Sequence, residues 1–319
     1  MEPFSAWIEL APGDRALVGE GEVVTAGMPI AERLRDRRLD EAPAIADRDP
    51  RRPGDRLVAD PGGGPLRRAA AAAGEIVFRS GRRWRVATGD VSDLVEAPGA
   101  GIVREVRAGT GMRLDLAGRA VPGAFAVGVP TRGVLRVSAD PGGDLHPTML
   151  DVGLAGSVLV VGSRVDAEML TRARAMGVRG VVVASMSGKE ARDFAASEAR
   201  QRAALHRLPA FAVLVVDGVV RRPLATPLVE ALTALAGSGV GIVADPPALV
   251  LDPEAPEPAP PDPAWVRLRH GPSAGREGRW LGALGPRRFR PGLRQEAGLV
   301  RLEDGTEVAV PLADLERWV

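Results

Sequence analysis

Residues 157–185 read SVLVVGSRVDAEMLTRARAMGVRGVVVAS, in which two apolar runs flank an amphipathic stretch. Apolar runs of this length are typical of strands buried on both faces, whereas the stretch between them spaces its apolar residues as a helix does. The alternation continues to residue 244 and predicts strands at 157–162, 180–185, 211–216 and 239–244 and helices at 166–176, 187–206 and 227–236. The sequence therefore predicts an α/β domain with a mostly parallel sheet that helices cover on both faces.

Two segments rich in turn-forming residues divide the chain. Residues 253–263 (PEAPEPAPPDP) contain six prolines and three acidic residues, a composition that favours an extended, semi-rigid spacer. Residues 139–147 (ADPGGDLHP) mark a second break. We therefore expect a β-rich domain at 1–140, the α/β domain at 148–252 and a small all-β domain at 264–319. We expect the spacer to hold the last domain apart unless its surface packs against the α/β domain.

The composition of the chain excludes several classes of protein. Of its 319 residues, 45% are hydrophobic and 26% are charged, which is the balance of an ordinary globular chain. Cysteine is absent, so disulfides, thiolate metal sites and cysteine nucleophiles are excluded. No apolar run approaches the ~20 residues of a membrane-spanning helix, and the first residues show no basic segment followed by an apolar run. We expect a cytoplasmic protein that does not enter a membrane.

The first domain contains short apolar runs between glycines and prolines, a pattern typical of small β-structures. A densely charged segment interrupts them. Its first part, AERLRDRRL at 31–39, is interpreted as an exposed helix, and PRRPGD at 50–55 as a loop. Residues 62–74 (GGGPLRRAAAAAG) are interpreted as a linker or a short helix.

Two segments of this domain, EGEVVTAGMPI at 20–30 and EAPGAGIVREVRAGTGMRL at 96–114, look alike. They resemble the two halves of the biotinyl/lipoyl pattern, at Ala97, Pro98, Gly101, Val103, Val106 and Gly109 and at Gly21, Val24 and Gly27. The resemblance implies a barrel-sandwich hybrid fold. Members of that family carry biotin or lipoate on a lysine, and residues 1–140 contain no lysine. Covalent biotin or lipoate is therefore excluded, which leaves a scaffold or docking barrel, or another small β domain with glycine turns.

The last domain opens with VRLRHGPSAGREGRWL at 266–281, which resembles the KOW motif of NusG-type transcription factors and certain ribosomal proteins. The matching positions are Val266, Leu268, Gly271, Pro272, Gly275, Gly278 and Trp280. Near the chain end, Asp304-Gly305 between two alternating segments predicts a β-hairpin. The resemblance implies a five-stranded SH3-like barrel, a fold whose members bind RNA, bind proteins or have no known ligand.

Positive charge is concentrated in this domain. Residues 264–294 contain eight arginines and one acidic residue, a balance of +7, whereas residues 295–319 contain two arginines and six acidic residues, a balance of −4. The segment 285–294 (GPRRFRPGLR) is interpreted as an inserted loop in which arginines surround one aromatic side chain, a combination suited to phosphate contact and base stacking. The candidate nucleic-acid-binding residues are Arg267, Arg269, Arg276, Arg279, Arg287, Arg288, Phe289, Arg290 and Arg294. The alternative is a solvated arginine loop with Trp280 and Trp318 in the barrel core.

The α/β domain contains polar residues where strands are expected to end. Parallel strands bind ligands at their carboxyl ends, so the candidate residues for an anionic ligand are Ser187, Lys189, Asp217 and Asp245. Ser187 and Glu190 also have the spacing of a helix capping box, which explains them without a ligand. The chain contains no GxGxxG, P-loop or GxSxG motif, and His146, His206 and His270 lie apart without metal-ligand spacing. The sequence therefore indicates no catalytic residues, no metal site and no cofactor.

These observations favour a non-catalytic, cytoplasmic binding protein that contacts RNA, a ribonucleoprotein or a transcription assembly through its C-terminal domain. A first alternative is a sensor or enzyme that uses the α/β sheet for a small anionic molecule. A second alternative is a scaffold that binds a protein partner.

Overall fold

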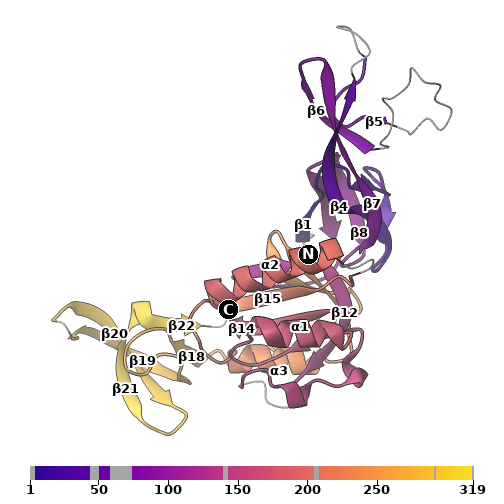
Figure 1. Cartoon of the computed structure of the whole chain (residues 1–319). Helices are drawn as coiled ribbons and strands as arrows, with labels where there is room; N and C mark the ends of the chain where they lie inside the picture. Colours follow the sequence, from indigo (N-terminus) through magenta and orange to yellow (C-terminus); the bar gives the residue numbers. More distant parts are fainter. Residues whose placement is uncertain are drawn as a thin grey trace.

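The computed structural model describes residues 4–43, 50–57, 74–138, 143–204, 208–290 and 292–317. Within these ranges the strands form four sheets, and three α-helices pack on the largest sheet. A long β-ribbon rises from one end of this central sheet, and the C-terminal strands form a separate lobe at the other end (Figure 1). Residues 62–73 of the predicted linker, His206 and Trp318 lie outside the described residues.

The N-terminal part of the chain forms two sheets, with strand orders β1-β9-β8-β3 and β2-β4-β7-β6-β5. Their strands are β1 (Phe4–Glu9), β2 (Arg15–Ala16), β3 (Val23–Val24), β4 (Pro29–Pro43), β5 (Arg56–Leu57), β6 (Gly74–Ser80), β7 (Arg83–Glu96), β8 (Gly101–Arg107) and β9 (Gly111–Leu116). Ile8, Val24, Val103 and Leu114 are buried in a shared apolar core. The β-rich character expected of this region is therefore present.

The two segments that look alike in sequence lie side by side in this core. Strand β3 pairs antiparallel with β8, and backbone hydrogen bonds continue the contact on both sides of the strands. Gly21 donates to Val103 at 2.8 Å, and Gly27 donates to Ala97 at 2.9 Å. Val103 and Ala97 donate back to Glu22 and Met28. Membership of the biotinyl/lipoyl family stays a prediction.

The charged segment at 31–39 is a strand, and the prediction of a helix there was wrong. It belongs to β4, which pairs with β7 along its length to form the ribbon at the top of Figure 1. Opposite charges meet across the ribbon, where Glu41 pairs with Arg83 and, at 2.6 Å, with Arg85. The segment has no apolar stripe of helical period, so the partner strand and its complementary charges decide its conformation.

The central sheet has eight strands in the order β10-β17-β16-β12-β13-β14-β15-β11. They are β10 (Ala120–Pro122), β11 (Phe125–Gly128), β12 (Thr131–Val137), β13 (Ser157–Val160), β14 (Gly180–Ser185), β15 (Ala212–Gly218), β16 (Gly239–Ala244) and β17 (Pro247–Leu251). Strands β12 to β15 are parallel, whereas the other four pair antiparallel with their neighbours. The sheet is therefore mixed instead of mostly parallel, because an apolar run does not reveal the direction of its strand.

One stretch of chain, 120–128, joins the two edges of the central sheet. Its first half, β10, pairs with β17, and its second half, β11, pairs with β15. Between the halves, Gly123 donates a backbone hydrogen bond to Pro247, and Ala124 donates one to Val215. This stretch and β12 precede residue 140 in the chain, yet they hydrogen-bond into the central sheet. The division of the chain into three domains stays a prediction.

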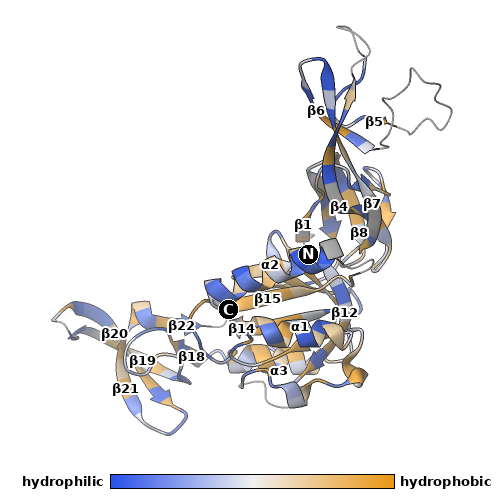
Figure 2. Cartoon of the chain, in the orientation of Figure 1, coloured by the Kyte–Doolittle hydropathy of each residue, from blue (hydrophilic) through white to orange (hydrophobic). Residues whose placement is uncertain are grey.

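Helices cover both faces of the central sheet, as expected. The α-helices are α1 (Ala167–Ala175), α2 (Gly188–Ala204) and α3 (Thr226–Ala234), and the 3-10 helices nearby are η1 (Pro147–Met149) and η2 (Val152–Leu154). Helices α1 and α2 share a core with Val181 and Val183, whereas α3 packs with Val182 and Leu214 on the other face. Figure 2 shows mainly hydrophobic strands beneath the hydrophilic side of α2.

The C-terminal sheet has five strands in the order β21-β20-β19-β18-β22. They are β18 (Trp265–Leu268), β19 (Glu277–Arg288), β20 (Arg294–Leu302), β21 (Glu307–Pro311) and β22 (Leu315–Arg317), and the 3-10 helix η3 (Leu312–Asp314) joins the last two. The predicted hairpin at Asp304-Gly305 joins β20 to β21. Trp280 packs against Gly298, where a Cβ atom would come within 1.9 Å of the indole ring.

Candidate functional site

The longest hairpin of the C-terminal sheet ends in a cluster of arginines. Strands β19 and β20 pair as far as Arg288 and Arg294, so residues 285–288 and 294 lie in strands where a loop was predicted. At the end of the hairpin Phe289 accepts a 2.5 Å hydrogen bond from Gly292. We call Arg287, Arg288, Arg290 and Arg294 the arginine tip.

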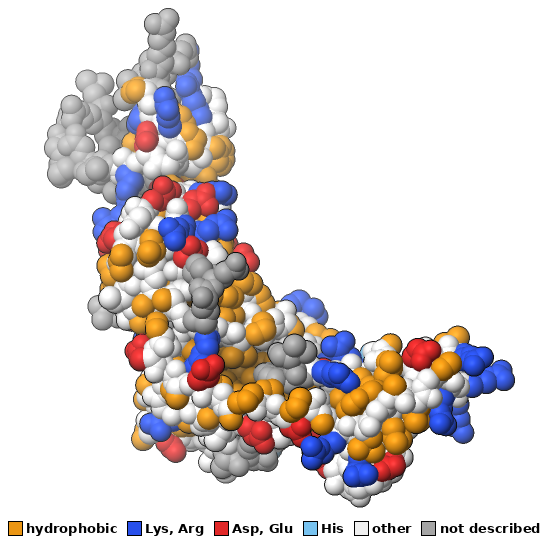
Figure 3. Space-filling model, turned by 180° about the vertical axis from the view of Figure 1, so that it is seen from behind, with side chains coloured by type: hydrophobic (Ala, Val, Ile, Leu, Met, Phe, Trp, Pro, Cys, Tyr) orange, Lys and Arg blue, Asp and Glu red, His pale blue; other side chains and the backbone are white. Residues whose placement is uncertain are grey.

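The side chains of the arginine tip are exposed and uncompensated. Among the residues that the structure describes, none of the four forms an ion pair. Arg288 and Arg294 stand directly opposite each other across the strands, which places like charges together at a cost in free energy. Figure 3 shows basic side chains gathered at the far end of the C-terminal lobe. The cluster therefore presents positive charge that no acidic side chain of the described ranges neutralises.

Two apolar side chains accompany this charge. Phe289 is half-buried at the turn, and Leu293 is 58% exposed. The amide of Phe289 donates a 2.8 Å hydrogen bond to the carbonyl of Leu293, which closes the turn. Arg288 donates a hydrogen bond to the Gly292 carbonyl at 3.3 Å, but it has no acidic partner among the described residues. An aromatic ring beside such guanidinium groups is chemically able to stack on a base while the guanidinium groups contact phosphate.

Three other candidate arginines have acidic neighbours. Arg276 pairs with Asp304 at 2.5 Å, and Arg279 pairs with Asp262 at 3.2 Å. The contact of Arg269 with Glu316 is longer, at 3.8 Å. These side chains are exposed, so the pairs are weak and screened by salt, but their charge is compensated locally.

Arg267 is not available to a nucleic acid, and its prediction as a contact residue was wrong. Its side chain is 1% exposed and donates hydrogen bonds to both oxygens of Asp217, at 2.7 and 2.9 Å, and of Glu316, at 2.9 and 3.2 Å. Burial lowers the pKa of the guanidinium, but these hydrogen bonds and charges outweigh burial and raise it overall. Arg267 instead joins the C-terminal sheet to the end of β15.

Glu277 provides a second connection between the two sheets. Its buried carboxylate accepts hydrogen bonds from the Thr226 amide, at 3.0 Å, and from the Trp265 indole, at 2.9 Å. Thr226 is the first residue of α3, so this carboxylate caps a helix that has no side-chain cap of its own. The C-terminal sheet thus packs against the central part, so the spacer at 253–263 does not hold the two apart. Glu277 is the one acidic residue among the eight arginines of residues 264–294, and this isolated position could have marked it as a residue with a specific role.

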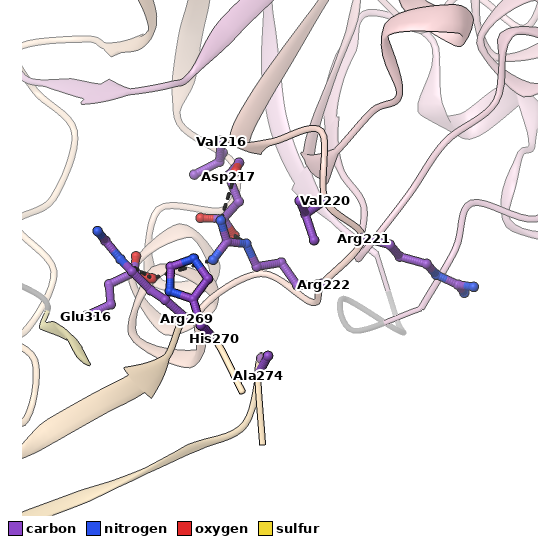
Figure 4. Close-up of a pocket in the computed structure, with 10 residues that line it drawn as sticks. Val216, Asp217, Val220, Arg221, Arg222, Arg269, His270, Ala274 and Glu316 are labelled. Atoms are coloured by element: carbon purple, nitrogen blue, oxygen red, sulfur yellow. Dashed lines mark hydrogen bonds and ion pairs between the residues drawn. The ribbon is translucent and has the colours of Figure 1, made fainter. Parts of the chain in front are cut away.

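Between these two parts lies an open cleft of about 490 Å³. We call it the interface cleft; it is lined by Val216, Asp217, Val220, Arg221, Arg222, Arg269, His270, Ala274, Gly275 and Glu316. Figure 4 shows Arg222 and His270 directed into the cleft and Arg221 directed away from it. Arg221 pairs with Asp144 at 2.8 Å instead. Sequence reasoning assigned no role to Arg221 or Arg222.

The residues predicted for an anionic ligand in the α/β part do not gather into one site: Ser187 follows β14 and Asp217 lies near the end of the neighbouring strand β15, whereas Asp245 follows β16. Ser187 and Glu190 form the capping box of α2: the Ser187 amide donates to Glu190 at 3.1 Å, and the Glu190 amide donates to Ser187 at 3.2 Å. Lys189 is exposed on the first turn of α2. Capping therefore accounts for the polar residues at this strand end.

Asp217 and Asp245 lie at opposite ends of the central sheet. Asp217 is at the carboxyl end of the parallel strand β15, where it binds Arg267. Asp245 follows the antiparallel strand β16 and accepts a backbone hydrogen bond from Trp7. The prediction that placed both aspartates at one edge was wrong, because it assumed that all four strands run in the same direction. Within the described residues, no group of three or more histidine, aspartate and glutamate side chains is arranged to hold a metal ion.

The arginine tip and the interface cleft are therefore two candidate sites in the described part of the chain. None of the α-helices in the described ranges combines the length and apolar character needed to cross a membrane. Comparison of the chain with protein-family models, with curated proteins and with solved structures gives no match.

Proposed function

We propose that this protein is a non-catalytic binding protein whose C-terminal sheet contacts RNA, alone or within a ribonucleoprotein or transcription assembly. The observation that carries the proposal is the arginine tip. Four exposed arginines without an acidic partner in the described part of the chain project from the lobe on a hairpin, next to Phe289. Because like charges repel, such a cluster favours a polyanion that neutralises them.

The form of the C-terminal sheet supports a KOW-like barrel. The KOW-like segment spans β18, the following turn and the start of β19. Gly271 and Gly275 in that turn have φ angles of +86° and +82°, which side chains with a Cβ atom rarely adopt. The sheet has five strands, which is the number in the barrel that the resemblance implies.

Filter binding of the full chain to single-stranded and to structured RNA across a salt series tests the proposal. We expect affinity to fall steeply as salt rises, because bound phosphates release their counterions. Replacing Arg287, Arg288 and Arg290 with alanine is expected to weaken binding at low salt. The logarithmic salt slope for single strands is expected to shrink by about 2 units, from roughly 0.7 for each lost phosphate contact.

A matched control removes three arginines of the same lobe that have acidic partners, Arg276, Arg279 and Arg301. Its net charge changes by the same amount, but we expect a much smaller change of slope. Replacing Phe289 with alanine is expected to cost about 1–3 kcal/mol on single strands without changing the slope. RNA binding without salt dependence, or an arginine-tip variant that binds as its parent does, would contradict the proposal.

A further inference from the structure

The interface cleft lies where α/β proteins bind small molecules. One wall is the end of β15 and the chain that follows it, up to Arg222, and the other is the turn of the C-terminal sheet that contains His270 and Gly275. Sheets of this kind bind ligands outside the carboxyl ends of their parallel strands, where successive loops diverge. The cleft also lies between two packed parts of the chain, a common location for ligand sites.

The carboxylates of the cleft are already occupied by Arg267. Asp217 and Glu316 each accept two hydrogen bonds from it at 2.7–3.2 Å. Arg222 approaches these carboxylates only at 3.8–3.9 Å, and Arg269 approaches Glu316 only at 3.8 Å, both beyond hydrogen-bond distance. Three arginines therefore face two carboxylates, which leaves a balance of +1.

Arg222 and Arg269 retain unused hydrogen-bond donors. Among the described residues, the Arg222 side chain donates one hydrogen bond, to the Asp217 carbonyl at 3.0 Å, and its Nε is buried without a partner. Within the described part of the chain, the Arg269 guanidinium has only its long contact with Glu316, and the side chain is 52% exposed. Guanidinium groups match the oxygens of a phosphate closely, because their N–H donors lie in one plane.

Apolar side chains line another part of the cleft, beside His270. Val216, Val220 and Ala274 line it, and Val220 is 66% exposed, so part of this surface is open to water. A volume of about 490 Å³ falls within the range of small-molecule sites. We propose that the interface cleft binds a small organic phosphate of mononucleotide size. Its phosphate lies between Arg222 and Arg269, and its organic part packs on Val216 and Val220.

Isothermal titration calorimetry of the full chain tests this assignment by measuring the affinity for three probes: adenosine 5′-monophosphate, adenosine and inorganic phosphate. We expect the nucleotide to bind at least about tenfold more tightly than either half of it, since it uses both the guanidinium groups and the apolar wall. The variants Arg222→Gln and Arg269→Gln are each expected to weaken nucleotide binding about tenfold. The matched control is Arg279→Gln, an exposed arginine of the same lobe that pairs with Asp262 and is not among the residues that line the cleft. It should bind as the parent does.

Circular dichroism melting verifies that each variant is folded. If replacement of Arg222 disturbs the interface, the Arg269→Gln variant still tests the proposal, because the Arg269 side chain is exposed. The proposal is overturned by the absence of nucleotide binding at millimolar concentration, by adenosine binding as tightly as the nucleotide, or by unchanged affinity in both variants. The variant that replaces Arg287, Arg288 and Arg290 separates this site from the RNA site. This variant should still bind the nucleotide. If it does not, the nucleotide binds at the arginine tip and the assignment to the interface cleft is wrong.

Discussion

Replacing Arg267 with alanine tests whether this residue holds the C-terminal sheet in place. The side chain donates five hydrogen bonds, four of them to Asp217 and Glu316 and one to the Pro223 carbonyl. Truncation leaves two carboxylates facing each other with only 10% and 22% of their side chains exposed. Removing one partner of a buried ion pair costs about 3–5 kcal/mol, and we expect the lower end because Arg222 is near enough to approach both carboxylates. A loss of this size is a large part of a typical unfolding free energy of about 5–15 kcal/mol.

The matched control is Arg269→Ala, which removes the same side chain two residues later. Arg269 is 52% exposed and reaches Glu316 only at 3.8 Å, so its replacement is expected to cost about 0–1 kcal/mol. Urea unfolding followed by tryptophan fluorescence measures both variants, since Trp265 and Trp280 lie in the C-terminal sheet. Hydrogen exchange of the β18 and β22 amides shows whether the loss is local. If Arg267→Ala costs no more than Arg269→Ala, the assignment of Arg267 to the interface is wrong.

Two further predictions concern residues of the same lobe. Glu277→Ala is expected to destabilise the protein by about 3 kcal/mol and Glu277→Gln by about 1 kcal/mol, since glutamine keeps an acceptor for the Thr226 amide but not the charge. Urea unfolding measures the free energy of both variants, and Glu303→Ala, at an exposed position, is the near-neutral control. The Thr306 amide and Arg276 lower the pKa of Asp304 from 3.8 to about 2, so its stabilising effect is complete above about pH 4 and is lost as pH falls towards 2. NMR titration of the Asp304 carboxyl measures this pKa directly, and Asp304→Asn should remove the part of acid unfolding in that pH window; an ordinary carboxyl pKa would contradict the assignment.

Local patterns predicted much of the central part of the fold. The apolar runs and amphipathic stretches between residues 157 and 244 correspond to β13 to β16 and α1 to α3. The hairpin at Asp304-Gly305 and the capping box at Ser187 are also present. Each of these features depends on residues that are close in sequence, such as side-chain period, turn propensity and cap spacing, so a single segment contains the whole signal.

Pairing between distant segments was not predictable in the same way. The charged segment 31–39 became a strand because β7 provides a complementary partner, and nothing within the segment reports that partner. The direction of β16 separated Asp245 from Asp217, although both follow apolar strands of similar appearance. The sequence also grouped Arg267 with the exposed arginines, since residue type and spacing do not show which side chain a neighbouring sheet will cover.

The sequence by itself determined the order of strands and helices in the central part, the absence of cysteine chemistry and of a carrier lysine in residues 1–140, and the concentration of arginine near the C-terminus. Only the tertiary structure decided which arginines are exposed. It buried Arg267 between two carboxylates, compensated Arg276 and Arg279, left the arginine tip without an acidic partner among the described residues, and directed Arg222 into a cleft. The physical reason is that the free energy of a charge depends on its solvent exposure and on the charges within a few ångströms, and both are set by contacts between residues far apart in the chain.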